Sequence, residues 1–303
     1  MSNATVVPQL QSAVNALVAG QVTQAQINNI VALTNQLVAD AVINFGPVIV
    51  TGTFGTQNVA LGDWSLAGGS GSTTGVGANG AFAFGQGARA LGGGSIAFGR
   101  GAKSDYTDTF VVGQGCQATA DNGRAAGWAC LSYGRQGYAH GYQASDRGID
   151  RVEAYSGGSF GTGSEDLGSA TAQTMRAVMR TVTTTAAPVV LTTDGRAFSF
   201  GNQLRLPDDS SFVVQWLVVA RDIATGDSRS WRVMAMATRN LGAGSTAVFA
   251  PVITDIGISS GTTSWGVSVA ADTYNGSISL SGIGQAGRTI QWVAAMIDAE
   301  NVG

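Results

Sequence analysis

Residues 81–92 read AFAFGQGARALG, residues 95–106 read SIAFGRGAKSDY, and residues 109–120 read TFVVGQGCQATA. These units are aligned by glycines that recur at a strict, constant interval, at Gly85, Gly99, Gly113, Gly127 and Gly141. Three positions after each glycine stands a column of small residues: Ala88, Ala102, Cys116, Cys130 and Ala144. Directly before each glycine stands a mainly apolar column: Phe84, Phe98, Val112, Ala126 and His140. Columns that agree over five units indicate one structural element repeated along the chain.

The 14-residue period is too short for a helical repeat and fits one coil of a parallel β-roll, with two short strands and two turns. Glycine suits positions where the chain turns with positive φ or another backbone comes close, and Ala or Cys suits a narrow interior. Such a thin coil buries little apolar surface by itself. We therefore expect the apolar column to face identical copies around a threefold axis, with a trimer seam that includes Phe84, Phe98, Val112 and His140.

The two cysteines and the single histidine lie in these columns. Cys116 and Cys130 should be one strand spacing apart with their side chains parallel, so we expect free thiols, with a disulfide as the alternative. His140 is expected to be an interface histidine. The alternative is that three copies of it hold a metal or an anion on the axis. The sequence predicts no metal site and no cofactor.

Composition excludes several classes of protein. The 303 residues include 44 glycines and only 12% charged residues, with a net charge of −3. Glycine is not at every third position, as collagen requires, and charge is too low for a disordered polyelectrolyte. No basic stripe is present, so we expect no nucleic-acid partner. No run of 18 apolar residues occurs, so we expect no membrane insertion, and the first residues lack the features of a secretory signal.

Residues 1–45 are predicted to form an N-terminal helical region. Thr23 and Gln26 have the spacing of a capping box, and Ile27, Ile30 and Leu37 follow on one face. A short helix with such a stripe is marginal alone, so these three residues are predicted to extend the trimer seam or to attach to another protein. The alternative is a helix packed on its own domain.

The rest of the chain divides by composition. We predict a β-roll shaft over 46–146, with an irregular Gly/Ser insertion at 68–80, and a Gly/Ser-rich neck over 147–171. Residues 172–303 contain β-rich runs separated by turn residues, such as the hairpin signal Tyr274-Asn275-Gly276-Ser277. The predicted fold is therefore mainly β, and it ends in an antiparallel, jelly-roll-like β-sandwich knob.

Two parts of the sequence resemble known families. The repeats over roughly 59–146 resemble the head repeats of trimeric autotransporter adhesins, which are left-handed parallel β-rolls. Residues 170–303 resemble C-terminal domains of tail fibres from phages and prophages, through Leu191-Thr192-Thr193-Asp194-Gly195, Leu206-Pro207, Trp265 and the terminal Thr289-Ile290-Gln291-Trp292. The second resemblance implies a bacteriophage virion protein, made in the host cytoplasm and carried on the tail or capsid surface.

The predicted function is attachment to a glycan or protein of the host surface, by a homotrimer that joins another virion protein through its N-terminal helices. Candidate receptor contacts are the aromatic residues of the last coils, Trp128, Tyr133, Tyr138 and Tyr142, whose rings suit sugar faces. The knob loops are also predicted to bind: Asp222–Ser230, Arg239–Ser245, Asp255–Ser264 and Asp272–Ser277. A head fibre or decoration protein is the main alternative.

A polysaccharide-depolymerising tailspike is the second alternative. It would need two carboxyl groups placed across a glycosidic bond. The candidate pairs, Asp105 with Asp108, Glu165 with Asp166 and Asp208 with Asp209, all stand in turn-forming sequence, where acidic side chains are normally solvated. The sequence therefore predicts no catalytic residue and a protein that is not an enzyme.

Overall fold

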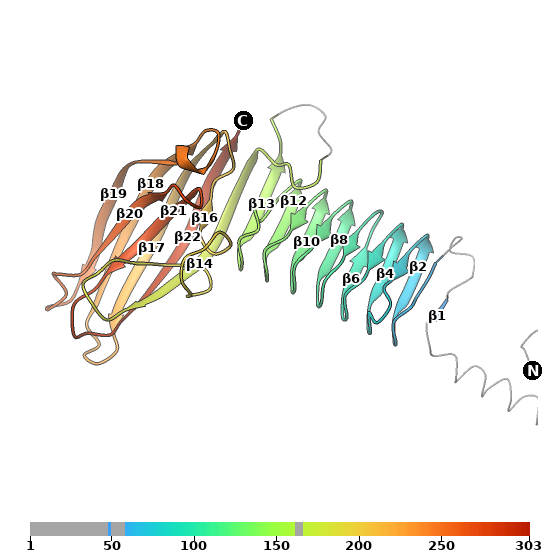
Figure 1. The fold of residues 1–303 in the computed structure, drawn as a ribbon, viewed down its shortest axis with the longest axis horizontal. Helices are drawn as coiled ribbons and strands as arrows, with labels where there is room; N and C mark the ends of the chain where they lie inside the picture. The colour runs from blue at the N-terminus through green and yellow to red at the C-terminus, as the bar shows by residue number, and fades with distance from the viewer. Residues whose placement is uncertain (1–47, 50–57, 161–165) are drawn as a thin grey trace, which may run out of the picture.

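The structure is a computed structural model that describes residues 48–49, 58–160 and 166–303. It is an elongated molecule with a ladder of short strands at one end and a two-sheet unit at the other (Figure 1). The mainly β class and the solenoid of the prediction are confirmed. The predicted helical region 1–45, with Ile27, Ile30 and Leu37, lies outside the described residues.

One strand from each coil forms the principal sheet of the solenoid. These strands pair in parallel and are β2 (Leu66–Ser70), β4 (Phe82–Gln86), β6 (Ile96–Phe98), β8 (Phe110–Gln114), β10 (Arg124–Trp128), β12 (Tyr138–Tyr142) and β13 (Glu153–Gly158). A preceding short strand, β1 (Val48–Ile49), pairs with β2. The second sheet contains β3 (Thr73–Thr74), β5 (Arg89–Ala90), β7 (Lys103–Ser104), β9 (Gln117–Ala118) and β11 (Leu131–Ser132). Equivalent residues of β4 to β12 pair at the spacing that the glycines mark.

The repeat columns have distinct places in the coil. Ala88, Ala102, Cys116, Cys130 and Ala144 are fully buried in the interior, and both cysteines are free thiols. The five glycines have φ between 106° and 137°. A Cβ on any of the first four would overlap the carbonyl oxygen of the next glycine in the column, and a Cβ on Gly141 would overlap that of Ser156. Glycine is therefore required twice over, for its backbone conformation and for the close stacking of coils.

The solenoid is longer than the strict repeat. Residues 68–80 were predicted to be an irregular insertion, but they contain most of β2 and all of β3, and Leu66 pairs with Phe82 at a longer interval than the glycine period. At the other end β13 lies inside the segment 147–171 that was predicted as a neck, and Tyr138 pairs with Glu153, again at a longer interval. The added residues are accommodated in turns, so the strands keep their pairing while the period changes.

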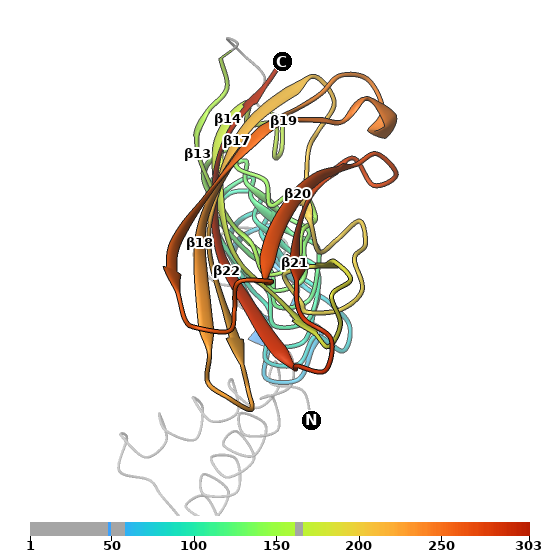
Figure 2. The same cartoon turned by 90° about the vertical axis from the view of Figure 1, so that its left-hand side faces the viewer.

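The two-sheet unit begins where β13 turns into the antiparallel strand β14 (Ala172–Thr183). Its large sheet has the order β14, β22 (Ile290–Val302), β17 (Ser210–Asp222), β18 (Ser228–Arg239) and β19 (Ala247–Ile258). Its small sheet contains β15 (Val189–Val190), β16 (Leu204–Arg205), β20 (Gly266–Asp272) and β21 (Ser277–Ile283). A short 3-10 turn, η1 (Ala243–Ser245), precedes β19. The two sheets face each other (Figure 2) and enclose one apolar cluster that includes Trp216, Trp231, Trp265 and Trp292.

The solenoid and the large sheet share a single sheet of 13 strands. Side chains of paired residues point to the same side of a sheet, so the pairing traces one face along its length. On this side lie His140 of β12, Tyr155 of β13, Val178 of β14, Ile297 of β22 and Leu217 of β17. We call this side the open face, because none of the strands described here covers it.

No helix among the described residues has the length and apolar character needed to cross a membrane.

Candidate functional site

The turns at one edge of the solenoid stack in register beside the two-sheet unit. Asp108, Asn122, Gln136 and Arg151 occupy equivalent turn positions with φ of 53°, 58°, 57° and 62°. Backbone hydrogen bonds join successive turns, from Gln136 N to Asp121 O at 3.1 Å and from Arg151 N to Arg135 O at 2.9 Å. The residues before these turn positions, Asp121, Arg135 and Asp150, are therefore aligned along the coil edge.

The loop between β15 and β16 lies against the last of these turns. The N–H of Asp150 donates to the carbonyl oxygen of Gly201 at 2.8 Å, which ties the loop to the coil. Within the loop, Asp194 Oδ1 accepts hydrogen bonds from Arg196 N at 3.0 Å and from Asn202 Nδ2 at 2.9 Å. Partial burial acts to raise the pKa of Asp194, but these hydrogen bonds to the carboxylate outweigh it and hold the pKa below its usual value.

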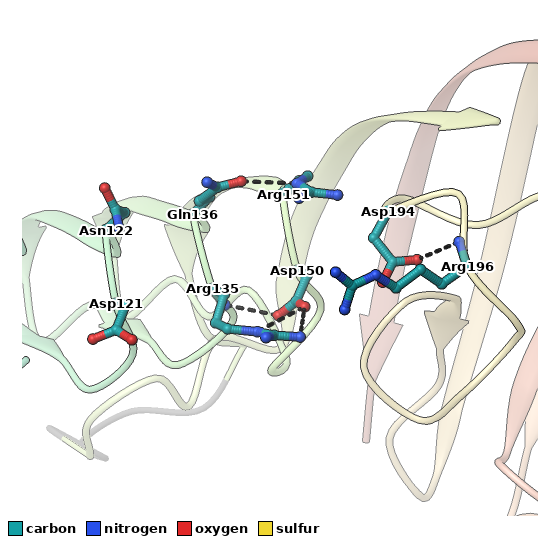
Figure 3. Close-up of a pocket in the computed structure, with 8 residues that line it drawn as sticks. All are labelled: Asp121, Asn122, Arg135, Gln136, Asp150, Arg151, Asp194 and Arg196. Carbon is teal, nitrogen blue, oxygen red and sulfur yellow. Dashed lines mark hydrogen bonds and ion pairs between the residues drawn. The ribbon is translucent and has the colours of Figure 1, made fainter.

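Coil edge and loop together enclose a hollow of about 130 Å³, which we call the junction groove (Figure 3). Arg135 binds Asp150 through its NH2 and Nε at 2.9 and 3.1 Å, and Arg151 Nε donates to Gln136 Oε1 at 2.8 Å. Arg196 extends from the loop toward the coil edge (Figure 3). The remaining lining residues are Asp121, Asn122 and Asp194.

The junction groove is lined by exposed or partly exposed polar side chains that both donate and accept hydrogen bonds. The guanidinium of Arg196 makes no hydrogen bond or ion pair with any described residue, and neither does the carboxylate of Asp121. Guanidinium, carboxylate and amide groups held on stacked turns suit a ligand rich in hydroxyl groups, such as a sugar.

The four predicted receptor aromatics lie in three different places. Trp128 and Tyr142 form an edge-to-face pair with ring centroids 5.0 Å apart at the opposite coil edge. Tyr138 stacks on His140 at 4.5 Å on the open face. Tyr133 lines a separate pocket between the solenoid and β16. They therefore do not form one common surface.

The predicted seam residues of the solenoid lie on the open face. Phe84 and Phe98 stack with ring centroids 5.3 Å apart, and Phe98 and Val112 are 42% and 37% exposed. His140 Nε2 lies 3.1 Å from Glu153 Oε1, which gives this histidine a partner within its own chain. Among the described residues, no group of three or more His, Cys, Asp or Glu side chains could hold a metal ion.

In two of the acidic pairs considered for catalysis, one carboxylate has an arginine partner. Asp105 pairs with Arg89 at 3.2 Å, and Asp208 pairs with Arg239 at 2.8 Å. Glu165 lies outside the described residues. None of these carboxylates lines the junction groove.

Two buried carboxylates that sequence reasoning missed face inward from β22, near the end of the solenoid. Burial, and then the neighbouring Glu300, raise the pKa of Asp298 well above its usual value. Burial also raises the pKa of Glu300, although Arg147 NH2 donates to its Oε2 at 3.1 Å. Asp298 Oδ1 accepts from Met175 N, while its Oδ2 is buried without a hydrogen-bond partner among the described residues.

We expect Asp298→Asn to stabilise the protein above neutral pH. A carboxyl group whose pKa is raised by folding contributes stability that is present below its unfolded pKa and is lost as pH rises through the folded pKa. The amide cannot ionise, so the variant should unfold at a higher temperature than the wild type at pH 8, and the gain should shrink toward pH 4. Asp63→Asn, at an exposed site, is the matched control and should show no such gain. A variant less stable than the wild type at pH 8 would contradict the assignment.

Sequence reasoning also missed the arginines around the junction. Arg135, Arg147 and Arg151 lie in turns of the coils, whereas Arg196 and Arg205 belong to the loop and strand that lie against those turns. The motif Leu191–Gly195 was the only feature of this loop that the sequence analysis used. The motif does not indicate which coil the loop contacts.

No protein-family model matches the sequence, and no curated protein matches it. Three similar solved structures are phage tailspike proteins. They come from Acinetobacter baumannii bacteriophage Fri1 (8% identity, TM-score 0.24), Acinetobacter phage vB_ApiP_P1 (9%, 0.23) and Acinetobacter baumannii phage AM24 (9%, 0.22). The alignments cover 75%, 76% and 76% of this chain, and 40%, 52% and 50% of the respective tailspikes. The chain thus spans about half the length of these proteins.

One of these comparisons corrects the sequence-based prediction about catalysis. The Fri1 tailspike is described as a capsular polysaccharide depolymerase, which is an enzyme. The prediction that the chain is not an enzyme is contradicted by this finding and is withdrawn.

Proposed function

We propose that this chain is a fibre or spike of a bacteriophage virion, in which three copies join through their open faces and bind a polysaccharide of the host surface. The observation that carries the proposal is the separation of two surfaces. Apolar residues are concentrated on the open face of the 13-stranded sheet, whereas the polar junction groove is lined only by turn and loop residues. Copies could therefore associate through one surface and leave the other available.

The open face supports assembly because it carries exposed apolar side chains on both the solenoid and the large sheet. Soluble monomers rarely expose continuous apolar patches larger than a few hundred Å². The apolar residues of this face that are at least 37% exposed include Phe82, Phe98, Phe110, Val112, Tyr155, Val178, Val182, Val213, Leu217, Val219, Met236, Val293 and Ile297. Exposed charged residues stand among them: Arg124, Glu153, Arg176, Arg180 and Arg232. A face of this kind gains stability by being buried against identical copies.

The edge strand β19 supports the same conclusion. It runs for 12 residues at the end of the 13-stranded sheet, and Phe249, Val252, Ile256 and Ile258 are each more than half exposed. Long apolar edges promote association unless another element covers them.

The junction groove supports polysaccharide binding through its hydrogen-bonding groups. Arg196, Asn122 and Asp121 offer donors and acceptors that the described part of the chain leaves available. Hydrogen bonds to the turns before and after it hold in place the turn that carries Asp121 and Asn122. Three grooves on one fibre would add avidity to weak individual contacts. The knob loops defined above are the alternative contact surface, and a mainly structural head fibre is the alternative assembly.

Cleavage of the polysaccharide is a second candidate function. Three carboxylates, Asp121, Asp150 and Asp194, line the same groove. Glycoside hydrolysis uses a pair of carboxyl groups that flank the scissile bond, so the groove contains the required type of side chain.

Binding is tested by passing the full chain over an array of purified bacterial capsular and lipopolysaccharide glycans. We expect retention on a small subset of them. The double variant Asp121→Asn, Arg196→Gln should weaken retention about tenfold or more, since it removes charge-assisted hydrogen bonds. Arg100→Gln, at an exposed position on the opposite coil edge, is the matched control.

Three outcomes separate the alternatives. If the double variant is retained on the glycans as well as the wild type, the knob loops and not the junction groove bind the polysaccharide. New reducing ends in the bound polysaccharide would establish cleavage. Failure of the full chain to bind any surface polysaccharide would overturn the proposal.

A further inference from the structure

A second pocket lies between the last solenoid coils and the small sheet. It has a volume of about 120 Å³ and is lined by Tyr133, Arg147, Arg205 and Pro207. Tyr133 follows β11, Arg147 follows β12, and Arg205 belongs to β16. The pocket is thus formed by two turns of the solenoid on one side and by the strand β16 with its flanking proline on the other.

Arg205 brings an uncompensated positive charge to this pocket. Its guanidinium carbon lies 3.7 Å from the centroid of the Phe200 ring, so one face of the guanidinium is stacked. No carboxylate of the described residues forms an ion pair with it, and its Nε is buried without a hydrogen-bond partner. Burial lowers the pKa of Arg205, as expected for a cation held partly away from water.

Arg147 adds a second guanidinium in a fixed orientation. Its NH2 donates to Glu300 Oε2 at 3.1 Å and to the Ala170 carbonyl at 3.2 Å. These contacts hold the side chain, of which only 13% is exposed, while its Nε is buried without a partner in the described chain. Two buried N–H donors, one from each arginine, are therefore unsatisfied, which is costly unless a ligand or water accepts from them.

The carboxyl groups around the pocket already have partners. Three guanidinium groups, those of Arg147, Arg205 and Arg239, stand near three carboxyl groups, those of Glu300, Asp208 and Asp146. Asp146 is buried and accepts hydrogen bonds from the hydroxyl of Ser132 and from the N–H groups of Tyr133 and Gly134. Asp208 is paired with Arg239 at 2.8 Å, and Glu300 is paired with Arg147. Arg205 therefore has no carboxylate partner of its own among the described residues, and its guanidinium lines the pocket from the β16 side.

We propose that this pocket binds the carboxylate of an acidic sugar residue, such as a uronic acid, in the host polysaccharide. The planar guanidinium of Arg205 matches a carboxylate in shape and charge. The ring of Tyr133, which is 39% exposed, offers a flat apolar surface against which a pyranose can pack. The pocket is small, which suits the acidic end of one monosaccharide and not a longer stretch of the glycan.

This inference rests on the proposed polysaccharide-binding function and deepens it. The junction groove and this pocket are both lined by the coil edge and by residues 194–207, so one chain of sugars could contact both. Arg205 lies in the small sheet, and Tyr133 follows β11 of the second solenoid sheet, so neither residue lies on the open face. Association through the open face would therefore not require them.

The test is a calorimetric titration of the full chain with sodium D-glucuronate, methyl D-glucopyranoside and sodium sulfate. Glucuronate should bind with a dissociation constant on the order of millimolar, as expected for one monosaccharide, and the neutral glucoside about tenfold more weakly or worse. Sulfate should also bind more weakly than glucuronate, because it lacks a ring to pack on Tyr133. Arg205→Gln should lower glucuronate affinity about tenfold, whereas Arg100→Gln should leave it unchanged.

Each contrary result overturns the inference. Equal binding of glucuronate and the neutral glucoside would show that the carboxylate is not recognised, and equal binding of sulfate would reduce the pocket to a general anion site. If Arg205→Gln fails to fold, Tyr133→Ala, which removes the ring and should also weaken glucuronate binding, and the ligand comparison on the wild-type chain still decide the question. Retention of a carboxyl-reduced polysaccharide as tightly as the native one would refute the acidic-sugar site and leave the proposed function standing.

Discussion

Gly113→Ala is expected to destabilise the solenoid by about 3 kcal/mol or more, which is among the largest effects that a single methyl group can produce. Gly113 has φ of 122°, and a Cβ there would lie 2.8 Å from the carbonyl carbon of Gly127 and overlap its oxygen. Both atoms belong to the backbone of the next coil, so relief requires the coils to move apart. The measurement is the free energy of unfolding in urea or, where unfolding is irreversible, the unfolding rate.

Gly115→Ala is the matched control for this prediction. Gly115 lies in the same coil with φ of 67°, but a Cβ there meets nothing within 4 Å. Its substitution should cost only the left-handed backbone strain, about 1–2 kcal/mol. Equal effects of the two substitutions would show that backbone conformation alone, without the contact between coils, explains the regular spacing of the glycines along the chain.

Leu217→Asp is expected to break the assembly into single chains. Leu217 is 49% exposed in the middle of β17, with its side chain on the open face. Each copy would lose about 1.5–3 kcal/mol of apolar burial and would also have to remove an unpaired carboxylate from water. In a trimer this penalty applies three times. The measurement is molar mass by light scattering during gel filtration, at a concentration on the order of micromolar.

Leu241→Asp makes the same chemical change at a loop position that is 82% exposed and lies off the open face. It should leave the mass of the assembly unchanged. If Leu217→Asp also leaves the mass unchanged while remaining folded, the open face is not the contact between copies.

The solenoid could be predicted from sequence because its contacts repeat at a fixed interval. Gly113 meets Gly127, and Ala102 is buried in line with Cys116, so each column records a contact with its neighbour. Coils that depart from the 14-residue period could not be recognised by the same alignment. Leu66 pairs with Phe82, and Tyr138 with Glu153, at intervals longer than the period, and both ends were therefore assigned to irregular sequence.

The junction could not be predicted in the same way, because its contacts join segments that are far apart in the chain and occur once. Arg147 contacts Glu300, and Tyr133 and Arg205 line one pocket, yet no spacing in the sequence relates these residues. The continuity of the open face was equally hidden. The Phe columns of the solenoid and the alternating residues of β17 are separate patterns until β13 and β14 join their strands in one sheet.

The most direct test of this account is the molar mass of the unmodified full chain at micromolar concentration. Burial of the open face between three copies predicts a stable species of three times the 30.7 kDa of one chain, unchanged on dilution. A folded protein with the mass of a single chain would contradict the account, because the apolar side chains of the open face would then remain in water.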